Sequence, residues 1–331
     1  MFDVLGIGDP IIDTHVQIGD KTNEVELKEI AGRKQLCLEY GAKISIADSF
    51  QTLGGNAANT TVALSRLGLK TAFISTVGDD SNGQLVIDLF KKFKVDTSLI
   101  TKEAGADTRY SIVLNYKAER TILSYAEKKN YIWPEPIPEC SWIFYSGLSE
   151  GFENIQKNLL AFLDTHKSVR LAVNPGSYML KNAREDLREA ARHADILIVN
   201  LEEAEKISGQ SLAAAKSEKA LIEALLLLGA KEVILTNGPR GAFAGSKEEV
   251  WQIGSYPVKV VSKTGAGDAF SAGYLAARLA RHDLPHALEW GTANSTGVIS
   301  AHGPHAGLLL NQTEIEKMIE RFPTVKPEKL N

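Results

Sequence analysis

Cysteine and long apolar runs are nearly absent from this sequence. The 331 residues include two cysteines, Cys37 and Cys140, whose spacing fits neither a disulfide framework nor a metal motif. The longest apolar run, near residues 221–229, contains Glu223 and is too short to cross a bilayer. We therefore expect no membrane association, and a reducing, cytoplasmic location.

A basic cluster is also missing. Lys and Arg number 37 against 41 Asp and Glu, and both signs are scattered along the chain. Because no basic patch could follow a phosphate backbone, nucleic acid is not an expected partner. Residues 1–8 have no basic stretch ahead of an apolar one, so they predict a strand rather than a signal peptide.

Short β-rich runs alternate with amphipathic helical stretches over most of the chain. Apolar residues recur at helical spacing around 85–93 and 155–163. The predicted strands include several continuous apolar runs, typical of parallel strands covered on both faces: 2–7, 71–77, 142–146, 169–174, 196–200 and 233–236. This alternation predicts an α/β fold, a three-layer α/β/α sandwich with a mostly parallel sheet, and we treat 1–331 as a single domain.

Two segments depart from this alternation. Residues 16–52 and 106–125 are rich in β-formers and lack a clean helical period. In the second segment, two β-rich runs flank the polar residues 117–119, which is typical of a β-hairpin. We expect both insertions to form a small β-sheet lid over a site, and a homodimer through this lid is a further expectation. Residues 323–331 are expected to form a surface tail.

The segment Thr264-Gly-Ala-Gly-Asp268 carries the strongest chemical signal. A β-branched run precedes it and a helix of small residues follows, so we expect a strand-to-helix turn. Gly265, Ala266 and Gly267 would direct backbone N–H groups at one point, forming an anion hole reinforced by the helix dipole. Asp268 at its rim would accept the proton of a hydroxyl that attacks a phosphate. From residue chemistry alone, an Asp that only complements the helix N-terminus fits equally well.

A second glycine segment is Gly54-Gly55-Asn56-Ala-Ala-Asn59, ahead of a helical stretch at 60–67. Its glycines permit close backbone approach to a ligand, and Asn56 and Asn59 present amides at a helix start. From these residues alone, an ordinary capped helix is the favoured interpretation.

In this order, the two segments resemble the signatures of the ribokinase-like carbohydrate kinases, the phosphofructokinase-B group. The resemblance covers nearly the whole chain. It implies ATP-dependent transfer of the γ-phosphoryl group to a hydroxyl of a small sugar or sugar-like acceptor, with Asp268 as general base. It also implies that Gly54, Gly55 and Asn59 line the acceptor site and that Asp13 holds acceptor hydroxyls, as a carboxylate suits.

The resemblance further implies a site for ATP and Mg²⁺. Asn200 and Glu203 match the family's Asn-x-x-Glu element, which helps to place the magnesium ion, through water, and the phosphates. The same pair is also typical of a helix capping box. Asn174, at a strand end on the same edge, is expected to reach acceptor or phosphate. The other expected nucleotide contacts are Thr236, Gly238, Gly241, Thr264 and Asn294, with residues 303–307 as a wall of the adenine site.

Some positions depart from the family pattern. Ser262 stands where the family usually has an Asp that helps to form a monovalent-cation site, so the sequence does not support such a cation as a cofactor. Lys263 replaces a frequent Thr, and a solvated lysine is the default interpretation. His302 and His305 are isolated in the sequence, which favours surface or otherwise satisfied positions over a ligand role.

Two functions of other classes are alternatives. Gly6 and Gly8 after the first strand suggest a dinucleotide-binding oxidoreductase, but the third glycine of that fingerprint would fall at Ile11. Pro10 also removes a backbone donor where the pyrophosphate would bind. A catalytically silent sugar- or nucleoside-binding regulator is the other alternative, and the intact segment 264–268 argues against it.

Within the kinase interpretation, an adenosine-type nucleoside acceptor stays open beside a sugar. A nucleoside would need an apolar or aromatic slot for its base. Four aromatic residues of the lid segments would form either that slot or the lid's own core: Tyr40, Phe50, Tyr110 and Tyr125.

Overall fold

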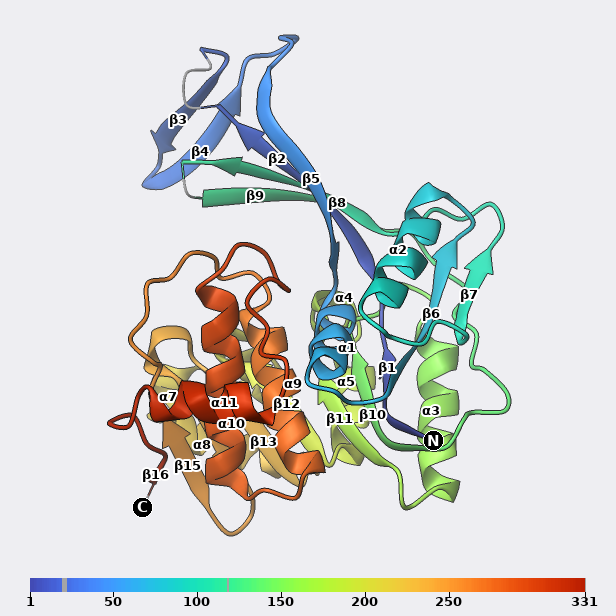
Figure 1. The fold of residues 1–331 in the computed structure, drawn as a ribbon, viewed down its shortest axis with the longest axis vertical. Coiled ribbons are helices and arrows are strands. Elements are labelled where there is room, and N and C mark those ends of the chain that lie inside the picture. The colour runs from blue at the N-terminus through green and yellow to red at the C-terminus, as the bar shows by residue number, and fades with distance from the viewer. Residues whose placement is uncertain (20–22, 118, 331) are drawn as a thin grey trace.

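The computed structural model describes residues 1–19, 23–117 and 119–330, and its largest sheet lies between two layers of helices (Figure 1). This ten-stranded sheet has the order β16-β15-β14-β13-β12-β11-β10-β1-β6-β7. The parallel strands are β1 (Phe2–Ile7), β6 (Thr71–Gly78), β7 (Ile100–Glu103), β10 (Cys140–Ser146), β11 (Arg170–Asn174), β12 (Ile196–Asn200) and β13 (Glu232–Thr236). The antiparallel edge strands are β14 (Ala242–Gly245), β15 (Val250–Ile253) and β16 (Glu328–Lys329).

Successive side chains of the central strands enter opposite cores. Val4 of β1 packs in one hydrophobic cluster and Leu5 in the other, because side chains alternate across a strand. One core is covered by α1 (Asn56–Arg66), α2 (Ser81–Lys92), α9 (Ala266–Leu279), α10 (Leu284–Ile299) and α11 (Gln312–Glu320). The other is covered by α3 (Glu153–Thr165), α4 (Ser177–Asn182), α5 (Arg184–His193), α6 (Leu201–Ser208) and α8 (Glu218–Leu226). The predicted α/β/α sandwich is confirmed.

Short elements join these layers. Helix α7 (Leu212–Ala215) lies between α6 and α8, and a 3₁₀ turn, η1 (Gly238–Arg240), links β13 to β14. Within the described ranges, no helix is both long and apolar enough to cross a membrane.

A separate four-stranded sheet, the second sheet, projects from the sandwich (Figure 1). Its order is β5-β2-β8-β9, from β2 (Ile11–Ile18), β5 (Ile46–Gly54), β8 (Tyr110–Tyr116) and β9 (Glu119–Tyr125). The pair β3 (Val25–Ile30) and β4 (Arg33–Leu38) extends beyond it. The segments 16–52 and 106–125 lie here, except that 20–22 and 118 fall outside the described residues. Strand β2 begins earlier than the predicted segment, so Asp13 belongs to a strand.

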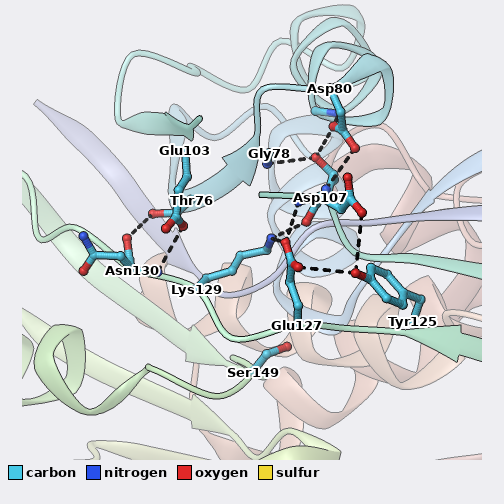
Figure 2. A network of polar contacts seen from close by, with 12 residues as sticks. Thr76, Gly78, Asp80, Glu103, Asp107, Tyr125, Glu127, Lys129, Asn130 and Ser149 are labelled. Carbon is cyan, nitrogen blue, oxygen red and sulfur yellow. Dashed lines mark hydrogen bonds and ion pairs between the residues drawn. The ribbon is translucent and has the colours of Figure 1, made fainter. Parts of the chain in front are cut away.

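Polar contacts join the two flanks of the β8–β9 hairpin at the base of the second sheet (Figure 2). The buried Lys129 donates from Nζ to the Asp107 carbonyl and lies 3.8 Å from Glu127 Oε1. The Asp107 N–H donates to Glu127 Oε1 at 2.5 Å, and the Tyr125 hydroxyl donates to Glu127 Oε2 at 3.3 Å. Because Asp107 precedes β8 and Tyr125 ends β9, these contacts fix both strands of the hairpin where they leave the sandwich.

One expectation for the last quarter of the chain was wrong, and another, the surface tail, is exposed as expected but also forms a strand. Residues 258–261, ahead of α9, form no strand. The β-branched residues Val260 and Val261 are 51% and 38% exposed, because this segment passes over the end of α10, where Val261 N–H bonds the Ile299 carbonyl. The expected tail pairs through β16 with β15, and Leu330 N–H bonds the Val250 carbonyl at 2.8 Å. An open edge strand offers unpaired backbone groups to whatever chain lies beside it. Asn331 lies outside the described residues.

Candidate active site

The two glycine-rich segments meet in space. Helices α1 and α9 begin next to each other, and Asn59 Nδ2 donates a hydrogen bond to Asp268 Oδ2 at 2.7 Å. Thr60 Oγ1 donates to the Asp268 carbonyl at 3.4 Å. The residue predicted to be the base and a residue predicted to line the acceptor site are therefore in direct contact.

The start of α9 is shaped to receive an anion. Gly265 precedes the helix with a φ of 78°, and a Cβ at this position would lie 2.6 Å from Pro304 Cβ, so glycine is required. Within the described residues, no side chain caps this helix. The Ala266 N–H bonds the Lys263 carbonyl at 3.4 Å, which leaves the N–H groups of Gly267 and Asp268 for a ligand. A Cβ on Gly267 would meet nothing within 4 Å, so the space there is open.

Asp268 is held in an environment that suits a base. Burial raises its pKa to about 6, while the hydrogen bond from Asn59 acts in the opposite direction. At neutral pH the carboxylate is thus ionised, yet its proton affinity is far above that of an ordinary Asp.

His305 contacts the side of the Asn59 amide that is opposite Asp268 in the hydrogen-bond chain. Its Nε2 lies 3.0 Å from Asn59 Oδ1. Burial lowers the pKa of His305 to about 4, and the positive charge of Arg66 adds to this effect. Because Asn59 uses its amide nitrogen on Asp268, its oxygen accepts the proton of the neutral imidazole. His305 is therefore a satisfied residue, as predicted, but one that orients Asn59, a role that the sequence did not indicate.

The carboxylate of Asp13 lies beside Gly54 of β5, two residues beyond Thr52, the register partner of Asp13. A Cβ on Gly54 would lie 2.2 Å from Asp13 Oδ2, so this glycine makes room for the carboxylate. Burial raises the pKa of Asp13, and a hydrogen bond from Ser111 and the guanidinium groups of Arg109 and Arg120 oppose this rise. Gly55 has a φ of 97° and allows the chain to turn from β5 into α1.

A cavity of about 520 Å³ runs along the carboxyl edge of the parallel strands. Open α/β sheets bind their ligands at this edge. Its walls come from the ends of β1, β10, β11 and β12 and from the starts of α1, α4 and α6. They include Asp9, Gly55, Asn56, Arg109, Gly147, Gly176, Asn200 and Glu203.

Asn200 and Glu203 form a capping box at the start of α6. Asn200 Oδ1 accepts from the Glu203 N–H, and Glu203 Oε2 accepts from the Asn200 N–H, both at 2.9 Å. Burial raises the pKa of Glu203 to about 7, and the charge of Asp268 contributes. The structural role expected for this pair is real, and both residues also line the cavity.

The turn after β13 lies at the same edge. Thr236 is paired in register with Asn200, and its Oγ1 donates to the Val199 carbonyl at 3.5 Å. Gly238 and Gly241 both have positive φ, and a Cβ on Gly241 would lie 1.9 Å from the Ile253 carbonyl oxygen. Glycine is therefore dictated by the turn itself.

Two of the expected contact residues are engaged in structural bonds. Asn174 Nδ2 donates to the Ile198 carbonyl at 2.9 Å, and its Oδ1 accepts from Asn56 Nδ2 at 3.1 Å. The fully buried Asn294 donates to the Ala269 carbonyl and accepts from the Leu309 N–H. Asn294 thus has no exposed atom with which to touch a nucleotide, and would shape the expected adenine wall only through its neighbours.

The second sheet also reaches this site. Arg120 of β9 donates from Nη1 to Thr264 Oγ1, at the edge of the glycine turn. Asp9, directly after β1, is buried and accepts from Tyr131 Oη at 2.6 Å and Ser149 Oγ at 2.5 Å. Neither residue was expected at the site from the sequence. The signal for Asp9 was its place at the end of a parallel strand, whereas Arg120 gave none.

Comparison with known proteins identifies the family. Residues 32–310 match the model of the pfkB family carbohydrate kinases. The chain belongs to the pfkB family of carbohydrate kinases. As a member of this family it is an enzyme, a carbohydrate kinase.

Relatives and solved structures agree with this assignment. The chain is 28% identical to the ribokinase of Staphylococcus aureus, over 78% of this chain and 85% of that protein. It is 25% identical to the 5-dehydro-2-deoxygluconokinase of Geobacillus thermodenitrificans, over 83% and 86%. Its fold matches the Arabidopsis thaliana ribokinase complexed with ribose and ATP, with a TM-score of 0.78, 18% identity and coverage of 96% and 99%. The fold is therefore ribokinase-like.

Proposed function

We propose that this pfkB-family kinase transfers the γ-phosphoryl group of ATP to a hydroxyl of a small sugar or sugar-like acceptor. The observation that carries the proposal is the contact between Asn59 and Asp268, beside an uncapped helix start. A proton acceptor and a group of anion-binding N–H donors then face the same point. Phosphoryl transfer requires both the proton acceptor and the N–H donors, because its catalysis rests on positioning and charge stabilisation.

Each residue has a defined part in the proposal. Asp268 takes the proton of the attacking hydroxyl, and its pKa of about 6 is close to the optimum for a base at neutral pH. The backbone of Gly265–Gly267 stabilises the charge on the phosphoryl oxygens. Asp13 and Asn59 hold acceptor hydroxyls, and the absent side chains of Gly54 and Gly55 leave room for the acceptor.

The residues of the carboxyl edge fit ATP with Mg²⁺. Among the described residues, no three His, Cys, Asp or Glu side chains converge as a metal site. The proposed arrangement needs none, because Mg²⁺ binds readily through phosphates and water, with Glu203 as an outer partner. Mg²⁺ would supply charge neutralisation. Asn200 and Thr264 would contact the phosphates, and the turn of Thr236, Gly238 and Gly241 would flank the rest of the nucleotide.

The second sheet is proposed to act as a lid on one domain, and as the contact surface of a homodimer. The link from Arg120 to Thr264 supports the lid. The second sheet and the adjoining β3–β4 pair expose apolar side chains that a second copy would cover: Leu27, Ile30, Leu38, Ile46, Phe50, Ile122 and Leu123. Light scattering on wild type and on Leu123→Glu would test the dimer, which predicts a halved mass for the variant.

A sugar is favoured over a nucleoside as acceptor. Tyr110 and Tyr125 pack against each other with ring centroids 5.2 Å apart, and Phe50 stacks on His15 at 4.6 Å. These aromatic side chains thus have partners within the second sheet, which supports the interpretation as the lid's own structure.

The test is ATP consumption with Mg²⁺ across pentoses, hexoses, sugar acids and nucleosides. The proposal expects at least one sugar or sugar acid to stimulate turnover, and Asp268→Asn to abolish the stimulation. Stimulation by nucleosides alone would replace the sugar with a nucleoside. Acceptor binding without turnover would instead support a silent regulator.

A further inference from the structure

Arg109 brings a buried donor without a partner to the wall of the cavity. It lies just before β8, where the chain enters the second sheet, and its side chain is 17% exposed. Its Nε is buried and has no hydrogen-bond partner among the described residues. Buried charged donors are normally paired, because an unmade bond of this kind costs about 1–3 kcal/mol or more. A guanidinium with so few partners, partly exposed beside a cavity, is available to a ligand that supplies acceptors.

Asp9 does not supply that acceptor. Arg109 Nη1 lies 3.5 Å from Asp9 Oδ2, a long contact for an ion pair. The two oxygens of Asp9 already accept short hydrogen bonds from Tyr131 and Ser149. Asp9 therefore offsets part of the charge of Arg109 and anchors it on one side, while most of the five guanidinium donors stay available.

The surrounding wall also favours an anion. Basic side chains slightly outnumber acidic ones, four to three, with Arg109, Lys181, Arg184 and Lys206 against Asp9, Glu202 and Glu203. Burial raises the pKa of Glu203 to about 7, so this acid carries less negative charge at neutral pH than an ordinary Glu. A small anion in this cavity would meet net positive potential.

Arg109 lies close to the residues that are proposed to hold the acceptor. Its charge acts on the carboxylate of Asp13, the proposed hydroxyl holder, and it shares the cavity wall with Gly55 and Asn56. A compact polyhydroxy molecule bound at Asp13 would thus bring another of its groups to the guanidinium. A neutral sugar offers the guanidinium only hydroxyl oxygens, whereas a carboxylate offers two charged oxygens to the planar fork.

We propose that the acceptor is a sugar acid and that Arg109 binds its carboxylate. This inference rests on the proposed function and names the acceptor class within it. A singly charged carboxylate fits better than a phosphate ester, because Asp9 lies beside the same guanidinium and would repel a dianion more strongly. Arg109 is thereby a specificity-determining residue, while Asp268 performs the proton transfer.

The test compares kcat/KM for matched pairs: hexonates and the corresponding hexoses, with hexose phosphates as a third arm. Wild type should prefer the acid about 10–100-fold, the usual worth of a charge-assisted bond. Arg109→Gln should remove this preference by lowering kcat/KM for the acid and leaving the neutral sugar within about 3-fold. Arg109→Lys keeps the charge but not the planar fork of donors, so its preference for the acid should lie between those of wild type and Arg109→Gln. Arg192→Gln, an exposed arginine on α5, is the matched control and should behave as wild type.

Failure of the inference can be told from failure of the proposed function. A neutral sugar or a hexose phosphate preferred over every acid would overturn the inference while leaving the kinase proposal intact. An equal loss for acid and neutral sugar in Arg109→Gln would do the same. Calorimetry without ATP is the second measurement: acid binding that disappears in Arg109→Gln supports the inference even if no acceptor is phosphorylated. No binding and no turnover with any acid overturns it.

Discussion

Asp268 accepts a hydrogen bond of 2.7 Å from Asn59, 209 positions away in the sequence. Asn59 in turn accepts from His305, so a neutral imidazole, an amide and a carboxylate form one chain of donors and acceptors. Burial raises the proton affinity of Asp268, and the hydrogen bond from Asn59 lowers it. The pKa of about 6 is the balance of the two effects, and each can be changed separately by mutation.

The first prediction is that Asp268→Asn lowers kcat by about 10²–10⁴-fold, the usual worth of a positioned proton acceptor. KM for the acceptor should change much less, because the amide keeps the shape and one hydrogen-bond acceptor. Steady-state kinetics with the best acceptor from the panel measure both constants.

A matched control for this variant is Asp283→Asn. Asp283 caps α10 through the His286 N–H, so the same chemical change is made at another helix start. The control should keep near-normal turnover. If Asp268→Asn also does, Asp268 is a helix-end residue and its assignment as the base is wrong.

The second prediction concerns stability. The folded-state pKa of Asp268, about 6, lies above its ordinary value of 3.8, so the native state holds the proton more tightly than the unfolded chain. Between these values, rising pH therefore costs stability, and the full cost is present above pH 6. Asp268→Asn should melt at a higher temperature than wild type at pH 7.5, and the difference should vanish below about pH 4.

Thermal melting of both proteins from pH 4 to 8 measures this effect. Loss of the favourable interaction between the carboxylate and the start of α9 acts in the opposite direction, by about 0.3–1 kcal/mol. A variant that is less stable than wild type at pH 7.5 would show that this helix-dipole term exceeds the cost of burial.

The layers of the fold were predictable because strands that are buried on both faces consist of continuous apolar residues. Strands Phe2–Ile7 and Ile196–Asn200 are covered on both faces, and their predicted bounds are confirmed. Residues 258–261 have the same β-branched character but pair with no strand in the part of the chain that the structure describes. Residues 328–329 lack that character and pair with β15 regardless. Local propensity yields to tertiary context in both cases.

The site was predictable only where the backbone itself carries the chemistry. Gly265 is needed for a left-handed turn against Pro304, and Gly54 for the approach of Asp13. Both requirements can be recognised in the sequence because only glycine meets them. His305 and Arg109 leave no local pattern. Their roles come from contacts with Asn59 and Asp9, 246 and 100 positions away. Such pairings appear only once the chain is folded.

The third prediction is that Asn59→Ala shifts the pH dependence of kcat/KM. In wild type, activity should fall as pH drops through about 6, because protonated Asp268 cannot act as a base. Without the Asn59 donor the carboxylate loses a bond to its charged form, so its pKa rises and the acid limb moves to higher pH.

Thr60→Val is the control for this shift. Thr60 lies next to Asn59 and donates to the backbone carbonyl of Asp268, not to its carboxylate. Its acid limb should coincide with that of wild type. An unchanged limb in Asn59→Ala would mean that Asn59 does not set the proton affinity of the base.

The fourth prediction separates stability from activity at the anion hole. Gly267 lies inside α9, and an added Cβ would meet no atom within 4 Å. Gly267→Ala should therefore raise the free energy of unfolding, by up to about 1 kcal/mol, because alanine loses less backbone freedom in a helix. The same methyl group would occupy the space in which phosphoryl oxygens approach the backbone, so kcat should fall on the order of 10²-fold. Denaturant unfolding and steady-state kinetics on one preparation measure both effects, and acceptor binding without ATP should be unchanged. A more stable variant with wild-type turnover would mean that the phosphates do not lie over Gly265–Gly267.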